Sequence, residues 1–489
     1  KNKKKIMMIR IQRLLGLILT ISTVLFSKDL IAQDKVFQAG ASITDITPHL
    51  GHPIVGNYNS PPATYIHDPL SVRTLVLDDG AKELVFVIVD NVHINREVFD
   101  AAKAMLDRDL NIPTKDVMMA STHTHSGISL NGEGLKSISP EVGVALDEYQ
   151  TFVVKRMVDG VKIARENKTL AKIAFGSVDV LEHVFNRRWI MKDSVMSPLG
   201  QLEIAKMNPG HSNALLRPAG PVDPEVSFIA VESKDGTPIA LLANYSLHYV
   251  GGVPKGHISA DYFAAFGNRM GELLETGSDL PAFIGIMTNG TSGDVNNNDY
   301  SKPRPKESLP PYAKMHYVAN DIAEKVHQEY KQLDFQSEVK LGSALSEMTL
   351  NVRRATPEIL TNVATVRDYE GSKPLFHSLE KTYSRRVFNM ESVYPDSVNI
   401  VLQSFAINDI GIASLPFEVF TQIGLDIKAK SPFKNTFTIE LANGSYGYLP
   451  TPEQHKLGGY ETWLTTNKVQ KDASVLITEQ LIKHFQQLK

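Results

Sequence analysis

Two histidines one residue apart, His123 and His125, follow an apolar run that begins at Met118, and Ser126 and Gly127 come directly after them. In an extended backbone, residues i and i+2 point to the same side, so both imidazoles can reach one site at the end of a strand. Two imidazoles at one point indicate a metal site, or one ligand beside a residue that positions it. Because surface and core histidines form the same pattern, further ligands have to come from elsewhere in the chain.

Other chemically capable side chains follow predicted strands at the point where each strand ends. They are His248, the polar segment 288–294, Glu418 and Tyr448. In open α/β sheets, ligands bind beyond the carboxyl ends of the strands. Two histidines and a glutamate are typical of a catalytic zinc site, with one position left open for water. Zinc lowers the pKa of that water toward about 7 and polarises a carbonyl oxygen, so His123, His248 and Glu418 predict hydrolysis of an amide or an ester.

Predicted strands and helices alternate along the chain and place these residues. The predicted strands are 83–90, 116–122, 171–181, 226–232, 239–247, 282–287, 339–350, 399–407, 411–415 and 436–441. The predicted helices are 96–110, 147–167, 262–276, 312–330, 417–428 and 473–487. This alternation predicts an α/β fold with mixed β-sheets layered with helices. We interpret residues 301–311 and 353–386 as surface insertions or substrate-contacting loops, so residues 34–489 are predicted to form a single large domain.

The N-terminal residues 1–33 have the three-part pattern of a secretory signal peptide. A basic region without acids precedes the apolar run 14–26, and Ala32 and Gln33 mark the expected cleavage point. The run is shorter than the roughly 20 apolar residues that a spanning helix needs, although an uncleaved anchor is the alternative. We therefore expect an exported protein, periplasmic or secreted, with no transmembrane segment after cleavage.

The composition excludes several classes of function. Of the 489 residues, 42% are hydrophobic and 21% are charged, which is typical of a globular protein. Residues 1–33 hold seven basic residues and one acid, so their removal changes the formal charge from −3 to −9. An acidic protein is a poor binder of phosphate backbones, so we expect no nucleic acid partner. Since the chain has no cysteine, any metal site must use His, carboxylate, Tyr or backbone ligands.

Eight short motifs along the chain, together with Ala39-Gly40, carry a family resemblance. They are TDITP at 44–48, STHTHSG at 121–127, NRR at 186–188, NYSLH at 244–248, SAD at 259–261, GDVN at 293–296, LPFE at 415–418 and YGYLPT at 446–451. In their order and spacing, the chain resembles the catalytic domain of the neutral/alkaline (non-lysosomal) ceramidases, and the Thr-His-Thr-His-Ser piece is the most specific. The resemblance implies the fold of that catalytic domain, without the C-terminal β-sandwich domain that usually follows it.

The resemblance also implies a role for each motif residue, around one Zn²⁺ per chain. His123, His248 and Glu418 would bind the metal. Tyr448 would be a fourth protein ligand or a donor to the developing oxyanion, unless it is an aromatic residue on a hydrophobic wall. His125 would lie beside the metal as a proton-transfer group.

Two further motifs concern the substrate. The resemblance implies that Arg187, with Asn186 beside it, binds a polar group or a carbonyl of the substrate, although Arg187 could instead be a structural ion-pair partner. The motif with Asp294 and Asn296 supplies further candidate catalytic residues. Family ceramidases have a serine implicated in catalysis where this chain has Asn296. An amide cannot be a nucleophile or a general base, but its NH₂ group can donate to an oxyanion.

Taken together, these features predict an exported zinc-dependent hydrolase that cleaves an N-acyl (amide) bond, such as that of ceramide, through a zinc-activated water. Its partner would be a lipid or another small-molecule substrate, with peripheral contact to a membrane surface. One alternative is a zinc-dependent esterase or deacylase that acts on an acylated glycan or another lipid. A second alternative, favoured by Asn296, is a lipid- or glycan-binding homologue without catalysis.

Overall fold

An eight-stranded mixed sheet lies at the centre of the fold, in the order β16-β14-β13-β8-β1-β4-β5-β6. Its strands are β1 (Gln38–Asp45), β4 (Ser71–Asp78), β5 (Glu83–Val89), β6 (Val117–Ser121), β8 (Thr169–Asp179), β13 (Glu225–Ser233), β14 (Pro238–Tyr245) and β16 (Ile284–Asn289). The pairs β5–β6 and β14–β16 are parallel and the other pairs are antiparallel. This arrangement confirms the prediction of mixed rather than purely parallel sheets.

A second sheet of four strands packs face to face against the first. Its strands are β18 (Leu341–Asn351), β19 (Ser397–Ile407), β20 (Ile410–Ser414) and β22 (Asn435–Ile439). Alternate residues of both sheets point into one shared apolar core, as expected from the two-residue period of a strand. At its centre, the rings of Phe86 and Phe405 lie 5.2 Å apart.

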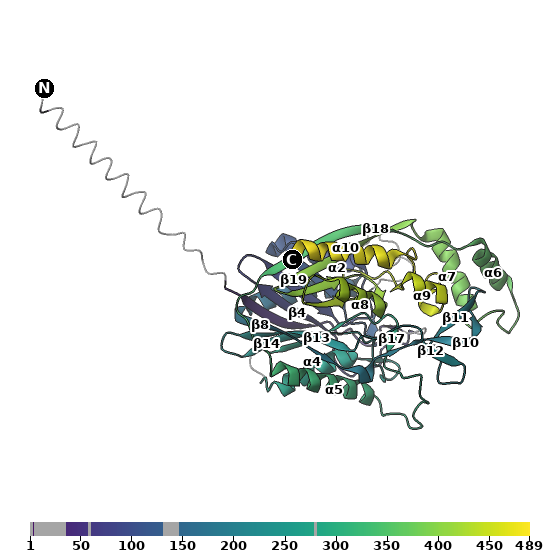
Figure 1. Cartoon of the computed structure of the whole chain (residues 1–489), viewed down its shortest axis with the longest axis horizontal. Helices are drawn as coiled ribbons and strands as arrows, with labels where there is room; N and C mark the ends of the chain where they lie inside the picture. Colours follow the sequence, from purple (N-terminus) through teal and green to yellow (C-terminus); the bar gives the residue numbers. More distant parts are fainter. Residues whose placement is uncertain (1–2, 4–35, 57–59, 131–145, 278–280) are drawn as a thin grey trace. The chain divides into compact units, whose positions relative to one another are not determined.

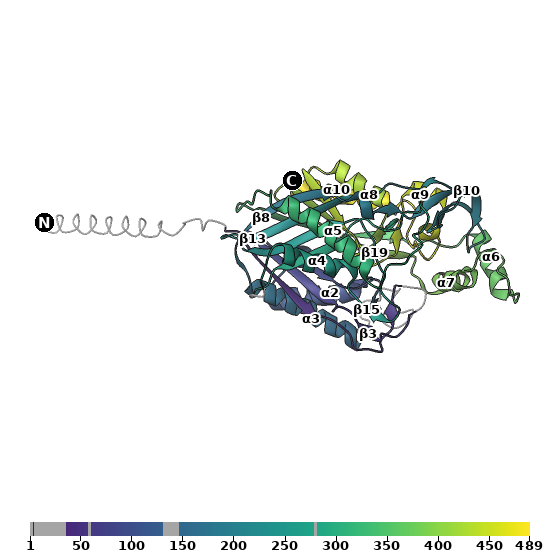
Figure 2. The ribbon, with the colours of Figure 1, turned by 90° about the horizontal axis from the view of Figure 1, so that it is seen from below.

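Helices cover the outer faces of both sheets, so the molecule has four layers (Figure 1). The first sheet carries α2 (Arg96–Leu110), α3 (Glu148–Glu166), α4 (Asp261–Leu273) and α5 (Ala313–Tyr330), and the second carries α8 (Thr421–Lys430) and α10 (Ala473–Leu488). Figure 2 shows α4 and α5 in front of the strands, with α2 and α3 beside them. In α2, the buried residues Val98, Phe99, Ala102 and Leu106 follow the helical period, which is why the sequence predicted this helix with the bounds observed.

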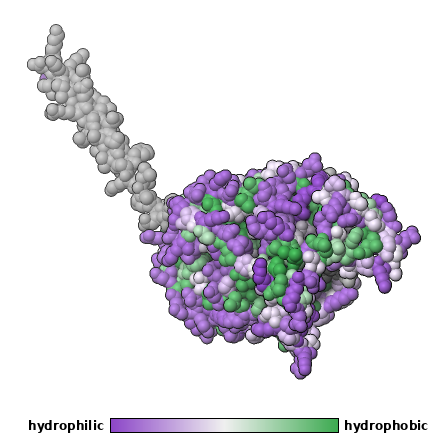
Figure 3. All heavy atoms as spheres, turned by 45° about the vertical axis from the view of Figure 1, so that its right-hand side comes forward, coloured by the Kyte–Doolittle hydropathy of each residue, from purple (hydrophilic) through white to green (hydrophobic). Residues whose placement is uncertain are grey.

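The residues that the computed structural model describes are 3, 36–56, 60–130, 146–277 and 281–489. The predicted signal peptide, residues 1–33, lies outside them apart from residue 3. Residues Phe37–Lys489 form one compact unit, in agreement with the prediction of a single large domain. No helix among the described residues is long and apolar enough to cross a membrane. Figure 3 shows hydrophilic residues over most of the face in view, interrupted by several hydrophobic patches.

Two regions differ from the sequence prediction. The predicted insertion 353–386 contains the helix α6 (Pro357–Asp368) and the start of α7 (Glu380–Val393). Each of these helices buries only a narrow stripe of apolar residues, so its periodicity is weak in the sequence. A three-stranded sheet of β10 (Arg188–Met196), β11 (Leu202–Met207) and β12 (Leu215–Pro218) was not predicted either, because most of its residues are exposed or half-buried and they show no regular alternation of apolar and polar types.

Short elements lie at the ends of the long strands and complete the region around the candidate site. The paired strands are β2 (Ile54–Val55) with β7 (Gly127–Ile128), β3 (Tyr65–Ile66) with β15 (His257–Ile258), β9 (Phe185–Asn186) with β17 (Val295–Asn296), and β21 (Glu418–Val419) with β23 (Tyr448–Leu449). The helix α9 (Pro452–Leu457) follows the last of them.

The segment that leaves β22 connects the two edge strands of the first sheet. The amide of Glu440 donates to the carbonyl of Asn289 in β16, and the amide of Ser121 in β6 donates to the carbonyl of Leu441. The strands β16 and β6 are the first and last in the order of that sheet, so adjacent residues of one segment contact both edges. The sheet is therefore curled, and the loops that follow its distant strands converge.

Candidate metal centre and its cavity

His123 lies just beyond the end of β6 with its backbone in the left-handed region, at φ 75°. Residues other than glycine seldom adopt this conformation, and they do so mainly at functional sites. The amide of His123 donates to the carbonyl of Asn91, and its Nδ1 lies 2.6 Å from the carbonyl oxygen of Val92. A carbonyl only accepts, so Nδ1 carries the proton and Nε2 presents a lone pair.

His248 and His125 complete a cluster of three imidazoles. Nε2 of His248 lies 2.9 Å from Nε2 of His123, and Nε2 of His125 lies 3.2 Å from the same atom. Nδ1 of His248 lies 3.2 Å from the carbonyl oxygen of Ser292, which leaves its Nε2 unprotonated as well. Two facing lone pairs repel each other at this distance, and a cation between them removes that repulsion.

A carboxylate and a phenol, from segments that follow the strands β20 and β22 of the second sheet, face these imidazoles. Glu418 and Tyr448 are partners in the parallel pair β21–β23. Oε2 of Glu418 lies 3.4 Å from Nε2 of His123 and 3.8 Å from Nε2 of His248. Imidazole nitrogens and a carboxylate oxygen form the donor set that zinc prefers, so the residues present fit a divalent metal. His123, His248 and Glu418 would hold it, and His125 lies within reach of the same point.

Burial sets the protonation of the cluster. It lowers the pKa of His248 and of His125 well below the ordinary imidazole value, and the neighbouring His123 adds to this effect. Burial alone would raise the pKa of Glu418, but His123, Tyr448 and Arg187 lower it, and the resulting pKa lies below the ordinary one. Two neutral imidazoles and an ionised carboxylate are therefore present at pH 7, which is the state that metal binding requires.

Arg187 lies directly beside the imidazole cluster. Its Nη1 is 3.2 Å from Nε2 of His248, and its guanidinium carbon lies 5.3 Å from the centre of the Tyr448 ring. Its Nε donates to Glu461, which also pairs with Arg188 at 2.7 Å. The side chain of Arg187 is thus an ion-pair partner and also a neighbour of the site. Whether it binds substrate, as its motif predicted, stays a prediction.

The remaining candidates from the sequence lie in a polar network next to this site. Oδ2 of Asp294 accepts from Asn186, its Oδ1 accepts from the amide of Thr421, and its carbonyl accepts from the amide of Arg187. The side-chain amide of Asn296 donates to Asn208 and Tyr300. Asp294 and Asn186 therefore fix the segment that carries Arg187, and the side-chain amide of Asn296 is engaged with Asn208 and Tyr300.

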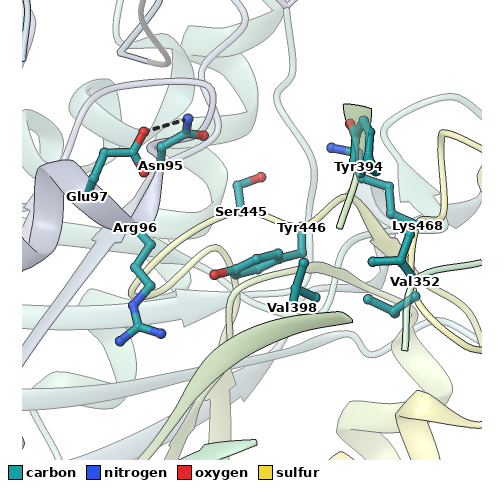
Figure 4. A pocket seen from close by; sticks show the side chains of 10 residues that line it. Asn95, Arg96, Glu97, Val352, Tyr394, Val398, Ser445, Tyr446 and Lys468 are labelled. Atoms are coloured by element: carbon teal, nitrogen blue, oxygen red, sulfur yellow. Dashed lines mark hydrogen bonds between the residues drawn. The ribbon is translucent and has the colours of Figure 1, made fainter. Parts of the chain in front are cut away.

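A cavity of about 560 Å³ opens onto Glu418 and Tyr448. His93 and Tyr460 line it beside them, and residues of α7 line it farther out. A second hollow of about 40 Å³ shares Asn95, Tyr394, Ser445 and Lys468 with this cavity. Figure 4 shows that smaller hollow, with the side chain of Lys468 running beside the ring of Tyr394.

Three residues near the site were missed in the sequence. His93 follows the end of β5, so the strand-end pattern that indicated His123 could have indicated it too. Burial lowers the pKa of His93 to about 4. Glu461 lies in a short 3-10 turn and Glu440 in the segment after β22, and neither has a recognisable motif around it. Only the structure shows that both carboxyl groups are buried among residues that contact the candidate ligands.

Comparison with known proteins identifies relatives of the chain. Residues 37–370 match the family model of the N-terminal domain of neutral/alkaline non-lysosomal ceramidase. This region includes His123, His125 and His248, whereas Glu418 and Tyr448 follow it. A crystal structure of neutral ceramidase from Pseudomonas aeruginosa matches with a TM-score of 0.69 and 15% identity, over 92% of this chain and 74% of that one. A ceramidase complexed with C2 matches with a TM-score of 0.66 and 15% identity, over 92% and 75%.

Proposed function

Because the chain belongs to the neutral/alkaline non-lysosomal ceramidase family and is a ceramidase-like hydrolase, we propose that it is a zinc-dependent amidohydrolase. Its substrate is a ceramide-like lipid, whose N-acyl bond it cleaves to a fatty acid and an amine. One observation carries the proposal: the imidazoles of His123 and His248 and the carboxylate of Glu418 converge on one point. The cavity of about 560 Å³ that reaches Glu418 and Tyr448 can admit part of a lipid.

The residues around the metal divide the work of hydrolysis. When bound, zinc supplies Lewis acidity, which lowers the pKa of a water and polarises a carbonyl oxygen. His125 is neutral because burial lowers its pKa, so it can accept a proton from the attacking water and return it to the leaving amine. Burial raises the pKa of Tyr448 well above its ordinary value, which keeps the hydroxyl protonated as a donor to the developing oxyanion. Arg187 holds the Tyr448 ring and adds positive charge beside it.

We also propose that the protein is exported, on the pattern of residues 1–33. Its mature N-terminus would lie near Ala32 or Gln33. N-terminal sequencing of the protein from periplasmic and culture fractions tests this. A full-length N-terminus in every fraction would contradict it.

The first experiment measures fatty-acid release from a ceramide by residues 34–489, with a chelator, without it, and after zinc is restored. We expect release that the chelator abolishes and zinc restores.

His123→Ala should lose stoichiometric zinc and at least about 10³-fold in activity, since it removes one of the three proposed ligands. His49→Ala, which removes an exposed histidine, should keep both. A His123→Ala protein with full zinc and full activity would show that the assignment is wrong.

The alternatives are separated with paired substrates. An N-acyl lipid and the O-acyl lipid with the same chain distinguish an amidase from an esterase, because only the leaving group differs between them. A protein that binds both lipids and hydrolyses neither would be a binding homologue. Asn296 does not favour that outcome on structural grounds, since its amide is engaged with Asn208 and Tyr300.

A further inference from the structure

The cavity is lined by three cationic side chains, the exposed Arg385 and Arg386 of α7 and the half-buried Lys468. Among the described residues, none of the three is within ion-pair distance of a carboxylate. Arg386 and Lys468 instead lie over aromatic rings, those of Tyr383 at 5.3 Å and Tyr394 at 6.0 Å. We call this set of three the cationic mouth.

Several cations with little exposure elsewhere in the fold have acidic partners, although Lys103 pairs with the neutral Asn443. Arg73 pairs with Asp90 at 2.6 Å, and Lys428 pairs with Asp223 at 2.7 Å. Lys468 has no such partner among the residues that the structure describes. Burial and the neighbouring Arg386 together lower its pKa to about 8, and Glu418 opposes both. A negative charge bound beside Lys468 would offset the cost of burying its ammonium group.

Neutral donors line the same cavity and point to the same kind of ligand. Thr465 has its backbone at φ 82°, which is strained for a β-branched residue. Its buried Oγ1 has no hydrogen-bond partner in the part of the chain that the structure describes. Asn389 and Ser445 also line the cavity. Hydroxyl and amide groups beside Arg and Lys are the usual donors to carboxylate, sulfonate and phosphate oxygens.

We propose that the cationic mouth binds an anionic group of the substrate, so that the protein prefers N-acyl lipids carrying a carboxylate, sulfonate or phosphate over neutral ceramides. This inference rests on the proposed hydrolysis of an N-acyl bond. Glu418 is the single acid among the described residues that line the cavity, and it lies at the metal centre. The mouth therefore presents net positive charge to an approaching substrate, which attracts an anion and leaves a neutral lipid unaffected.

The test compares two substrates with one acyl chain, anionic N-lauroylglycine and neutral N-lauroylethanolamine. Wild-type protein should have the higher kcat/KM on N-lauroylglycine, by about tenfold or more at low salt, and the advantage should shrink as salt rises. The double variant Arg385→Gln/Arg386→Gln changes exposed positions of α7, so it should fold. It should lower kcat/KM for the anionic substrate at least about tenfold more than for the neutral one. Lys468→Met should act in the same direction.

A matched control and a binding measurement make the result decisive. Lys234→Gln removes an exposed cation from the turn between β13 and β14 and should leave the substrate preference unchanged. Equal loss on both substrates in the double variant, or a wild-type protein without preference, would overturn the inference while hydrolysis itself stands. If neither lipid is hydrolysed, the affinities of the two lipids for the metal-free protein still test the cationic mouth. Tighter binding of N-lauroylglycine that the double variant loses supports the cationic mouth and rejects the proposed function, and equal binding rejects both.

Discussion

At the scale of single residues, the position of His125 depends on a glycine that lies far from it in the sequence. Gly56 has φ 111°, and a Cβ atom there would lie 2.8 to 2.9 Å from the ring and backbone of His125. On its other side, the His125 ring stacks on Tyr249 with centroids 3.8 Å apart. The imidazole thus lies between the backbone of Gly56 and the ring of Tyr249. A methyl group on residue 56 would displace it from this position.

Gly56→Ala should therefore lower kcat by at least about tenfold with little loss of bound zinc, because it displaces the proposed proton-transfer group. Gly51→Ala is the matched control. It also places alanine at a positive φ, 97°, but nothing lies within 4 Å of its Cβ. Both variants carry the same backbone strain of about 1 kcal/mol, so the difference between them reports the clash with His125. Equal kcat values in the two variants would contradict the role of His125.

The sequence predicted which residues would meet at this site but not how they are supported. His123, His248, Glu418 and Tyr448 follow predicted strands, and the structure brings them together. The left-handed backbone of His123 could not be predicted, because the carbonyl that accepts its amide belongs to Asn91, just beyond the end of β5. The roles of these residues as ligands and donors remain predictions.

At the scale of elements, the segment after β22 links the sheet edges to the candidate ligands through Glu440. This carboxyl group is fully buried and accepts from the amide of Val419, next to Glu418, and from the hydroxyl of Ser292. Ser292 in turn lies against Nδ1 of His248. Burial raises the pKa of Glu440 well above its ordinary value, which favours the neutral form of the group.

Replacement of Glu440 should weaken zinc binding without removing any ligand. We expect Glu440→Ala to raise the Kd for zinc by about 10 to 100-fold, the range found when partners of ligands are lost. Glu440→Gln should have a smaller effect, because a neutral amide of the same shape replaces a neutral carboxyl group. Competition with a zinc-binding dye measures both. A Glu440→Ala protein with unchanged affinity would show that the segment does not position the ligands.

The helix α2 carries a buried lysine that should give the fold a distinctive pH dependence. Burial lowers the pKa of Lys103 to about 7, and its Nζ donates to Asn443 at 2.6 Å. Between pH 7 and its ordinary pKa of 10.5, the unfolded chain keeps a proton that the native state has released. Stability therefore rises with pH in this window, by at most about 1.4 kcal/mol per pH unit.

Lys103→Met should abolish that rise. The measurement is the free energy of unfolding in denaturant at pH 7, 8 and 9, for the variant and the wild type. Lys162→Met, which removes an exposed charge from α3, corrects for the loss of one positive charge. Parallel curves for wild type and Lys103→Met would mean that Lys103 stays protonated in the native state.

Helices and strands with a clear apolar period were predicted well, and those without one were not. The bounds of α2 were predicted at both ends, whereas α6 and α7 were interpreted as part of an insertion. The strands β1 and β4 were also missed, although both are largely buried. In β1 small residues such as Ala39, Gly40 and Ala41 replace the branched residues that mark a strand in the sequence. The curl of the first sheet depends on contacts between distant segments, so no local pattern reports it.

At the scale of the whole molecule, the interface between the two sheets should determine stability and leave the chemistry intact. Phe405 is fully buried between the sheets against Phe86. Phe405→Ala should cost about 3 to 5 kcal/mol of unfolding free energy, measured in denaturant, because it leaves a cavity in a closely packed core. Phe152→Ala, on the exposed face of α3, should cost far less. In native buffer, both variants should hydrolyse the substrate at the wild-type rate, and a large loss in Phe405→Ala alone would show that the core and the site are coupled.

The curl of the first sheet has a kinetic meaning for the metal. Its proposed ligands come from residues 123, 248 and 418, and the segment 440–443 holds the edges of the sheet together behind them. Contacts between such distant parts of a chain form late and slowly. We expect the proposed ligands to release a bound ion fully only when the two edges separate. The rate at which a chelator removes zinc would then measure the rate at which the two edges separate. After a short exposure to the chelator, protein molecules that have not opened would still contain zinc.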